Sequence, residues 1–191
     1  MNSTDETIIE LSKMKLVLLI LGSCAFVAAG GWLLSFDTEE IQYGRSFGFF
    51  YNNPLIVYGL GLAAILFFGF SGLYSLKKVF DKKPGLILNS SGIVDNASAV
   101  AAGFIPWSDV TGSGIYEIQK QKMLIIGVRD PQKYLDRGGA LSRAFNKANA
   151  GMSGSPVAIS SVALKIEFSE LVSLFNRYHH KYGGASAERE S

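Results

Sequence analysis

Two long apolar runs constrain the fold of this chain more than any other feature of its sequence. Residues 16–36 and 55–76 contain no Asp, Glu, Lys or Arg. A helix of that length crosses roughly 30 Å, the thickness of the hydrocarbon core of a bilayer. A buried helix of a soluble protein keeps a polar stripe, and neither run has one. The sequence therefore predicts two transmembrane helices, over residues 16–36 and 54–76.

The rest of the chain is long enough for one small domain. The chain has 191 residues, a net charge of +2 and a single cysteine. This composition excludes an internal disulfide, a zinc site built on cysteines and a broad basic field for nucleic acid. Besides the two helices, the predicted parts are a cytoplasmic N-terminal segment (1–15), a periplasmic or extracellular connector (37–53), a basic linker (77–84), a cytoplasmic domain (85–182) and a disordered tail (183–191).

The charges beside the two helices predict their orientation. Short loops rich in lysine and arginine stay on the cytoplasmic side of a membrane. Lysines precede the first helix and follow the second, whereas the connector holds one arginine against three acidic residues. Both termini are therefore expected in the cytoplasm. The aromatic residues of the connector are expected at the lipid interface, and they are Tyr43, Phe47, Phe49, Phe50 and Tyr51.

The run LGSC, which ends at Cys24, is similar to the cleavage site of a bacterial lipoprotein signal. However, the chain stays apolar over residues 25–34 and a second apolar run follows, which is untypical of a cleaved lipoprotein. We therefore expect Cys24 to lie within the first helix, with lipoprotein processing as the alternative.

Small residues recur at four-residue spacing in both apolar runs. Ala25 and Ala29 show this spacing in the first run, and Gly59 and Ala63 show it in the second. Small side chains let two membrane helices approach closely. These four residues are therefore the predicted contact of a helical hairpin.

Short runs of apolar and β-branched residues, separated by Gly, Pro, Asn and Ser, predict an antiparallel meander in the domain. Residues 115–119 and 123–128 flank a polar turn and predict a hairpin. The alternation over residues 162–168 leaves strand and loop both open. The other predicted strands cover residues 85–88, 93–94, 103–107 and 156–160.

Two helical segments follow from the same patterns. Asp130 and Pro131 are typical of a helix start, and the Gly-Gly pair at 138–139 is expected to interrupt that helix. Ser169 is expected to cap a last helix that packs on the sheet. Apolar residues recur at helical spacing at Leu141, Phe145 and Ala148 after the interruption, and at Leu171, Leu174, Phe175 and Tyr178 in the last helix.

The sequence shows no arrangement of residues for catalysis or metal binding. It lacks paired carboxylates, nucleophile motifs and phosphate-binding glycine loops. His179 and His180 are adjacent on a helix, so they face different directions and cannot hold one metal ion together. We therefore predict no enzymatic activity, no cofactor, no metal and no nucleic-acid partner.

Basic residues near the predicted membrane boundary are the most suggestive functional feature. Gathered on one face, they would bind the head groups of anionic lipids. The candidate lipid-facing residues are Lys77, Lys78, Lys82, Lys83, Lys120, Lys122, Lys133 and Arg137.

Several short motifs resemble those of one group of membrane proteins. They are GLILNSSGI (85–93), IPWSDV (105–110), DPQKYL (130–135), SPVAI (155–159) and the last helix. Together with the two apolar runs, they resemble small bacterial inner-membrane proteins that carry a cytoplasmic pleckstrin-homology-like (YcxB-like) domain. The resemblance implies an α+β membrane protein with a curved antiparallel sheet or partial barrel, closed by a C-terminal helix. It implies no catalytic residues.

These observations favour a non-enzymatic adaptor at the bacterial inner membrane. Its domain would bind a protein partner, or its own copies, by pairing at a sheet edge. One alternative is a domain that senses anionic lipid, and another is a membrane subunit or immunity protein that acts through the hairpin. Trp107 is expected to plug the sheet beneath the last helix, with a role as a partner anchor as the alternative.

Overall fold

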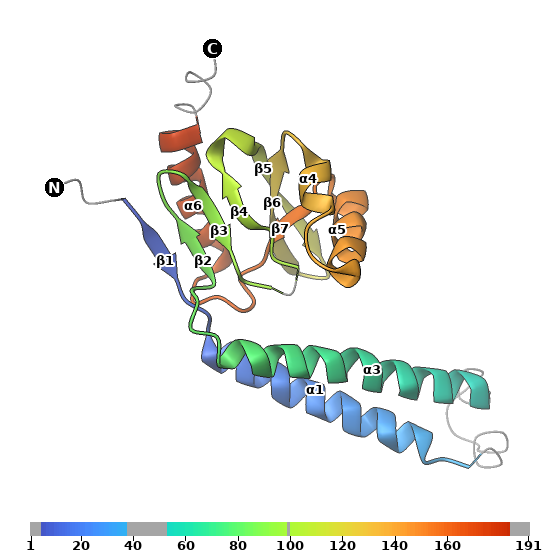
Figure 1. Ribbon diagram of the computed structural model, residues 1–191. Coiled ribbons are helices and arrows are strands. Elements are labelled where there is room, and N and C mark those ends of the chain that lie inside the picture. Colours follow the sequence, from blue (N-terminus) through green and yellow to red (C-terminus); the bar gives the residue numbers. More distant parts are fainter. Residues whose placement is uncertain (1–4, 38–52, 99, 184–191) are drawn as a thin grey trace. The chain divides into compact units, whose positions relative to one another are not determined.

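The chain forms two compact units (Figure 1). One is a helical hairpin, Lys13–Asp81, and the other combines Met1–Ser12 with Lys82–Ser191. The aromatic residues of the connector and the tail beyond residue 183 lie outside the described residues. The residues that this computed structural model describes are 5–37, 53–98 and 100–183.

Two long helices form the hairpin, α1 (Lys13–Leu34) and α3 (Pro54–Val79). Proline at the first position of α3 costs no helical hydrogen bond. The side chain of Asn53 caps the same helix by accepting a hydrogen bond from the amide of Leu55, at 3.0 Å. Both helices are long and apolar enough to cross a membrane, as the sequence predicts.

The backbones of α1 and α3 approach closely at Gly30 and Gly61. A Cβ atom on Gly30 would lie 2.7 Å from the carbonyl oxygen of Gly61, so no larger residue fits there without a shift. The buried residues of α1 (Leu16, Ser23 and Gly30) recur every seven residues, the repeat of helices packed at a shallow angle. This repeat corrects the predicted contact, because the residues chosen by four-residue spacing lie on exposed faces, namely Ala25, Ala29, Gly59 and Ala63.

The described part of the second unit holds seven strands in two antiparallel sheets. The first sheet has the order β1-β2-β3-β4 and the second has the order β5-β6-β7. Between the sheets, Trp107–Asp109 forms a single 3₁₀ turn, so the predicted strand 103–107 ends one residue early. The strands are β1 (Thr7–Ile9), β2 (Leu86–Leu88), β3 (Gly92–Asp95), β4 (Gly103–Pro106), β5 (Val110–Ile118), β6 (Gln121–Val128) and β7 (Val157–Ile159).

The first strand comes from the N-terminal segment, for which the sequence predicts no strand. β1 runs antiparallel to β2, with Ile9 opposite Leu86. The amide of Gly85 donates to the carbonyl of Ile9 at 2.9 Å. The helical hairpin is therefore an insertion between the first two strands of the domain.

The other side of the N-terminal segment contacts the chain after β7. The amide of Ser12 donates to the carbonyl of Ala163 at 2.8 Å, and the amide of Lys165 donates to the carbonyl of Glu10 at 2.9 Å. Residues 162–168 form no strand of their own, and only a single bridge joins Leu164 to Leu11. The alternating apolar pattern of that segment is thus the pattern of a loop that lies along the N-terminal segment.

The predicted interrupted helix is present as α4 (Pro131–Leu135) and α5 (Ala140–Ser153). Asp130 caps α4 by accepting hydrogen bonds from the amides of Gln132 and Lys133, at 3.1 and 3.3 Å. Gly138 has a φ of 81°, a conformation that glycine adopts at little cost and that ends the helical path. Both the start and the interruption are as expected.

The last helix, α6 (Phe168–Tyr178), continues into a π-helical turn over His179–Gly183. Its N-cap is Glu167 rather than Ser169, and no side chain caps it. Ser169 lies inside the first turn because the helix begins at Phe168. The predicted packing face is confirmed, since Leu171, Leu174, Phe175 and Tyr178 are all buried.

Candidate protein-interaction surface

The longest hairpin of the domain, β5–β6, is closed by a two-residue turn. Gln119 and Lys120 have φ angles of 48° and 68°, and the type I′ turn requires positive φ at both positions. Ile118 pairs with Gln121 directly beyond the turn. The predicted hairpin is therefore present, with its turn at 119–120 instead of 120–122.

Strand β5 is the edge of its sheet, and no strand among the described residues pairs with its outer side. In an antiparallel pair, alternate residues direct their backbone N–H and C=O groups away from the partner strand. Counted from the hydrogen-bonded pair that closes a two-residue turn, the outward residues of β5 are Ser113, Ile115 and Glu117. Such groups can accept an extended peptide as a further strand.

The side chains along this edge give it an apolar, largely unprotected centre. Ile115 is 58% exposed, and Ile118 is also exposed. Edge strands are often protected by charges, prolines or bulges. Here the pairing is irregular only between Val110 and Gly112, at the start of the strand, and the charge of Glu117 lies near its end. The sequence analysis missed the first half of β5 because its glycines interrupt the strand pattern.

The free edge of β4, by contrast, is occupied by a side chain of the same chain. Nη1 of Arg137 donates to the carbonyls of Ala102 and Phe104, at 2.5 and 2.8 Å. The guanidinium group also lies over the ring of Tyr134, 4.2 Å from its centre. The carbonyl of Phe104 in β4 and that of Ala102 just before the strand therefore have a partner, and β5 is the longer of these two edge strands.

Asp109 links the 3₁₀ turn to α4. Its carboxylate accepts hydrogen bonds from Lys133 Nζ at 2.6 Å and from the hydroxyl of Tyr134 at 2.7 Å. Partial burial raises the pKa of Asp109, but hydrogen bonds from Lys133 and Tyr134 and the charges of Lys133 and Arg137 outweigh it, so the pKa is below its ordinary value. Burial and the neighbouring carboxylate raise the pKa of Tyr134 well above its ordinary value, so its hydroxyl stays protonated.

This cluster predicts that the Asp109→Asn variant loses more stability at neutral pH than in acid. Because the pKa of Asp109 is lower in the folded protein, the ionised carboxylate contributes fully above the ordinary pKa of 3.8. That contribution disappears as the pH falls through the lowered value. Urea unfolding of both proteins at pH 7 and near pH 3 measures the difference. An equal loss at the two pH values would contradict a role for the ionised carboxylate.

Trp107 is buried beneath the last helix. Its side chain is 1% exposed, and its indole N–H donates to the carbonyl of Asn89 at 2.8 Å. Its ring lies 5.8 Å from that of Phe175 and 6.5 Å from that of Tyr178, between ring centres. Trp107 therefore occupies the core position expected of a plug and is not accessible to a partner.

The basic residues considered for lipid binding do not share one environment. Lys133 and Arg137 make the contacts described above, and Lys78 is buried and forms an ion pair with Asp81 at 3.1 Å. Lys122 lies on the β5–β6 hairpin, 4.0 Å from Glu117. The exposed lysines of the set outside α4 are Lys77, Lys82, Lys83, Lys120 and Lys122.

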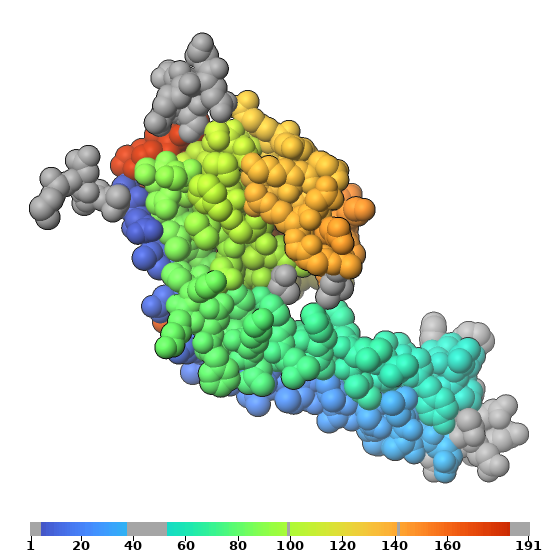
Figure 2. Space-filling model, viewed as in Figure 1, coloured from blue at the N-terminus to red at the C-terminus, as the bar shows by residue number. Residues whose placement is uncertain are grey.

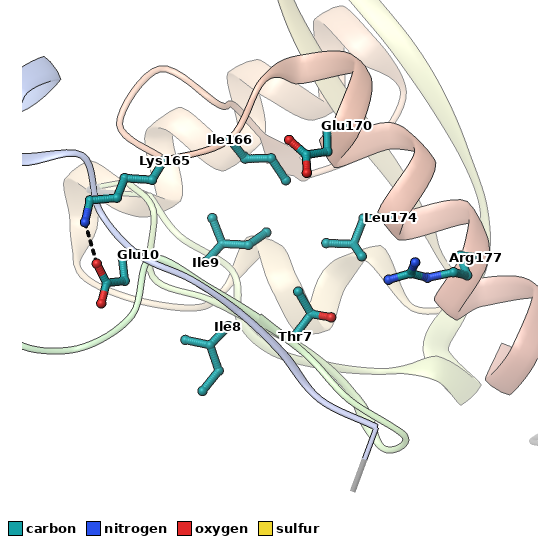
Figure 3. Close-up of a pocket in the computed structure, with 9 residues that line it drawn as sticks. All are labelled: Thr7, Ile8, Ile9, Glu10, Lys165, Ile166, Glu170, Leu174 and Arg177. Atoms are coloured by element: carbon teal, nitrogen blue, oxygen red, sulfur yellow. Dashed lines mark hydrogen bonds and ion pairs between the residues drawn. The ribbon is translucent and has the colours of Figure 1, made fainter. Parts of the chain in front are cut away.

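A pocket of about 400 Å³ lies between β1 and α6 (Figure 3). Ile9 and Leu174 contribute apolar lining, while Glu10 and Lys165 form an ion pair of 2.5 Å at its rim. Arg177 extends from α6 on another side (Figure 3). The sequence analysis missed this pocket because one wall is the N-terminal strand. Its charges of both signs give it no clear preference for an anion or a cation.

No group of three or more metal-ligating side chains gathers in the described part of the chain. Comparison of the chain with protein-family models, with curated proteins and with solved structures finds no match. The class of protein is therefore defined by the structure itself. It is an α+β protein in which a hairpin of two long apolar helices interrupts a domain of antiparallel sheets with a C-terminal helix.

Proposed function

We propose that this protein is a non-enzymatic adaptor, anchored in a membrane by its hairpin, whose domain binds an extended segment of a protein partner. The partner segment adds a strand to the outer edge of β5. The observation that carries this proposal is the unpaired β5 edge, with exposed Ile115 at its centre. Backbone pairing supplies affinity in this mode, and side chains beside the edge supply selectivity.

The proposal places the protein in the bacterial inner membrane with both termini in the cytoplasm. The pairing of β1 with β2 supports a common side for the two ends of the hairpin, because these strands directly precede and follow it. The lysines of the exit segment support the cytoplasmic side. The two antiparallel sheets with a C-terminal helix agree with the pleckstrin-homology-like fold that the sequence resemblance implies.

Site-specific photo-crosslinking in native membranes tests this function. A crosslinking amino acid at Ile115 of the full chain is expected to form one discrete adduct with a partner protein. The same group at Val162, which is exposed on the loop after β7, is the control and is expected to form none. Adducts common to both positions, or adducts with lipid only, would contradict the proposal.

A pair of substitutions at Glu117 separates strand addition from side-chain recognition. Glu117→Pro removes an outward N–H group from β5, and the loss of a backbone hydrogen bond is expected to reduce the adduct about tenfold. Glu117→Ala keeps that group, so the adduct is expected to persist. Equal yields from the two variants would argue against pairing at the edge. An adduct with a second copy of the chain would identify the occupant as the protein itself.

A further inference from the structure

Helix α5 turns its polar side toward the domain. Asn146 is the most buried of the α5 side chains that the structure describes, and its side-chain amide donates to the carbonyl of Tyr134 at 3.0 Å. The hydroxyl of Ser153 donates within the helix to the carbonyl of Asn149 at 2.8 Å and also lies 3.3 Å from the carbonyl of Ser155, next to the start of β7. The buried side of α5 is therefore centred on a polar residue that is hydrogen-bonded to α4.

The apolar side of α5 faces outward. Phe145 is 44% exposed and Met152 is 52% exposed, and the alanines at 144 and 148 are exposed as well. At 100° per residue, these four positions fall within an arc of about 100°, opposite Asn146. Figure 2 shows α5, in orange, at the surface of the domain. The side chain of Leu141, which the sequence pattern groups with Phe145, lies outside the described residues.

The charges of α5 have a single sign. Its sequence, ALSRAFNKANAGMS, contains Arg143 and Lys147 and no acidic residue. Both basic residues are exposed and lie on the same side of the apolar arc, Lys147 about 60° and Arg143 about 100° from its edge at Ala144. An exposed apolar face beside basic residues is the pattern of helices that lie in the interface of an anionic bilayer.

We propose that the apolar face of α5 lies in the head-group region of an anionic lipid bilayer, with Arg143 and Lys147 against lipid phosphates. Both ends of the apolar hairpin connect to the domain, since Ser12 precedes α1 directly and β2 begins soon after α3. Such a double tether keeps the domain at a high effective concentration near the membrane. A short amphipathic face with two basic residues is then sufficient for docking.

This inference rests on the membrane anchoring in the proposed function, but it is independent of partner binding at β5. A second copy of the chain would be a poorer occupant, because identical basic residues would face each other across a contact between two α5 faces. The lipid surface offers both an apolar layer and negative charge.

Quenching by brominated lipid tests the inference in the full chain. The protein is reconstituted in vesicles of phosphatidylethanolamine and phosphatidylglycerol, with or without bromine on the acyl chains. An environment-sensitive dye is placed on Met152→Cys or on Ser173→Cys of α6, each in a Cys24→Ser background, because Cys24 is the only native cysteine. The native protein labelled at Cys24, an exposed residue of α1, reports whether the hairpin is inserted.

The three probe positions give separate outcomes. Quenching is expected at 24 and 152 and not at 173, which is exposed on the last helix. Neutralising both Arg143 and Lys147 by substitution with glutamine is expected to lower the ratio of docked to undocked domain roughly thirtyfold, and so to abolish quenching at 152. Quenching at 24 without quenching at 152 would overturn the inference alone, whereas absence of quenching at 24 would overturn the membrane anchoring. A blue-shifted but unquenched probe at 152 would show that protein, and not lipid, covers the face.

Discussion

Replacing Trp107 with alanine is expected to lower the free energy of unfolding of the domain by about 3–5 kcal/mol. The substitution removes the largest fully buried side chain among the described residues and leaves a cavity beneath α6. It also leaves the carbonyl of Asn89 without the indole N–H that it accepts at 2.8 Å. An effect of this size is a large share of the stability of a small domain.

Hydrogen exchange of the strand amides measures this loss in the full chain. The amides of β3 and β4 are expected to exchange much faster in Trp107→Ala, because Trp107 directly follows β4 and bonds to the turn before β3. Trp32→Ala is the matched control, since Trp32 is exposed on α1. Unchanged exchange in Trp107→Ala would show that the indole ring is not part of the core.

Replacing Ile9 with alanine is expected to cost the domain about 2–5 kcal/mol, although Ile9 lies in a three-residue strand at the N-terminus. Its side chain is 6% exposed, and β1 fills the space between β2 and the loop that contains Leu164. Urea unfolding of the full chain, followed by the fluorescence of Trp107 in a Trp32→Phe background, measures the change.

The neighbouring residue provides the control for Ile9. Ile8 is 54% exposed because successive side chains of a strand point to opposite faces. Ile8→Ala is expected to change stability by no more than about 0.5 kcal/mol. Equal effects of the two substitutions would mean that β1 is not docked on β2 in solution.

Several elements could be predicted because their signals are local. The last helix shows its buried face through Leu171, Leu174 and Phe175 at helical spacing, and α4 shows its start through Asp130 and Pro131. Each signal depends on residues within one or two turns of each other. Predictions from such local patterns are correct here because the folded protein buries the predicted face of α6 and uses the predicted cap of α4.

The candidate site was only partly predictable. The β5–β6 hairpin follows from its sequence, but the unpaired outer edge of β5 is a property of the whole sheet. The sequence shows Lys133 and Arg137 only as basic residues. The fold shows that Lys133 is paired with Asp109 and that Arg137 donates to the carbonyls of Ala102 and Phe104. Charge alone therefore overestimates the surface that is free to bind lipid.

The sequence by itself determined the two long apolar helices, most of the strands and the last helix. Their composition and periodicity are sufficient, because a run of about twenty apolar residues or a repeated apolar face needs no distant partner to be recognised. The tertiary structure alone decided that residues 7–9 form the first strand, that Gly30 meets Gly61 and that α5 turns its apolar side outward. Each of these depends on a surface supplied by residues far away in the chain, and the sequence of a short segment does not indicate which distant residues it will contact.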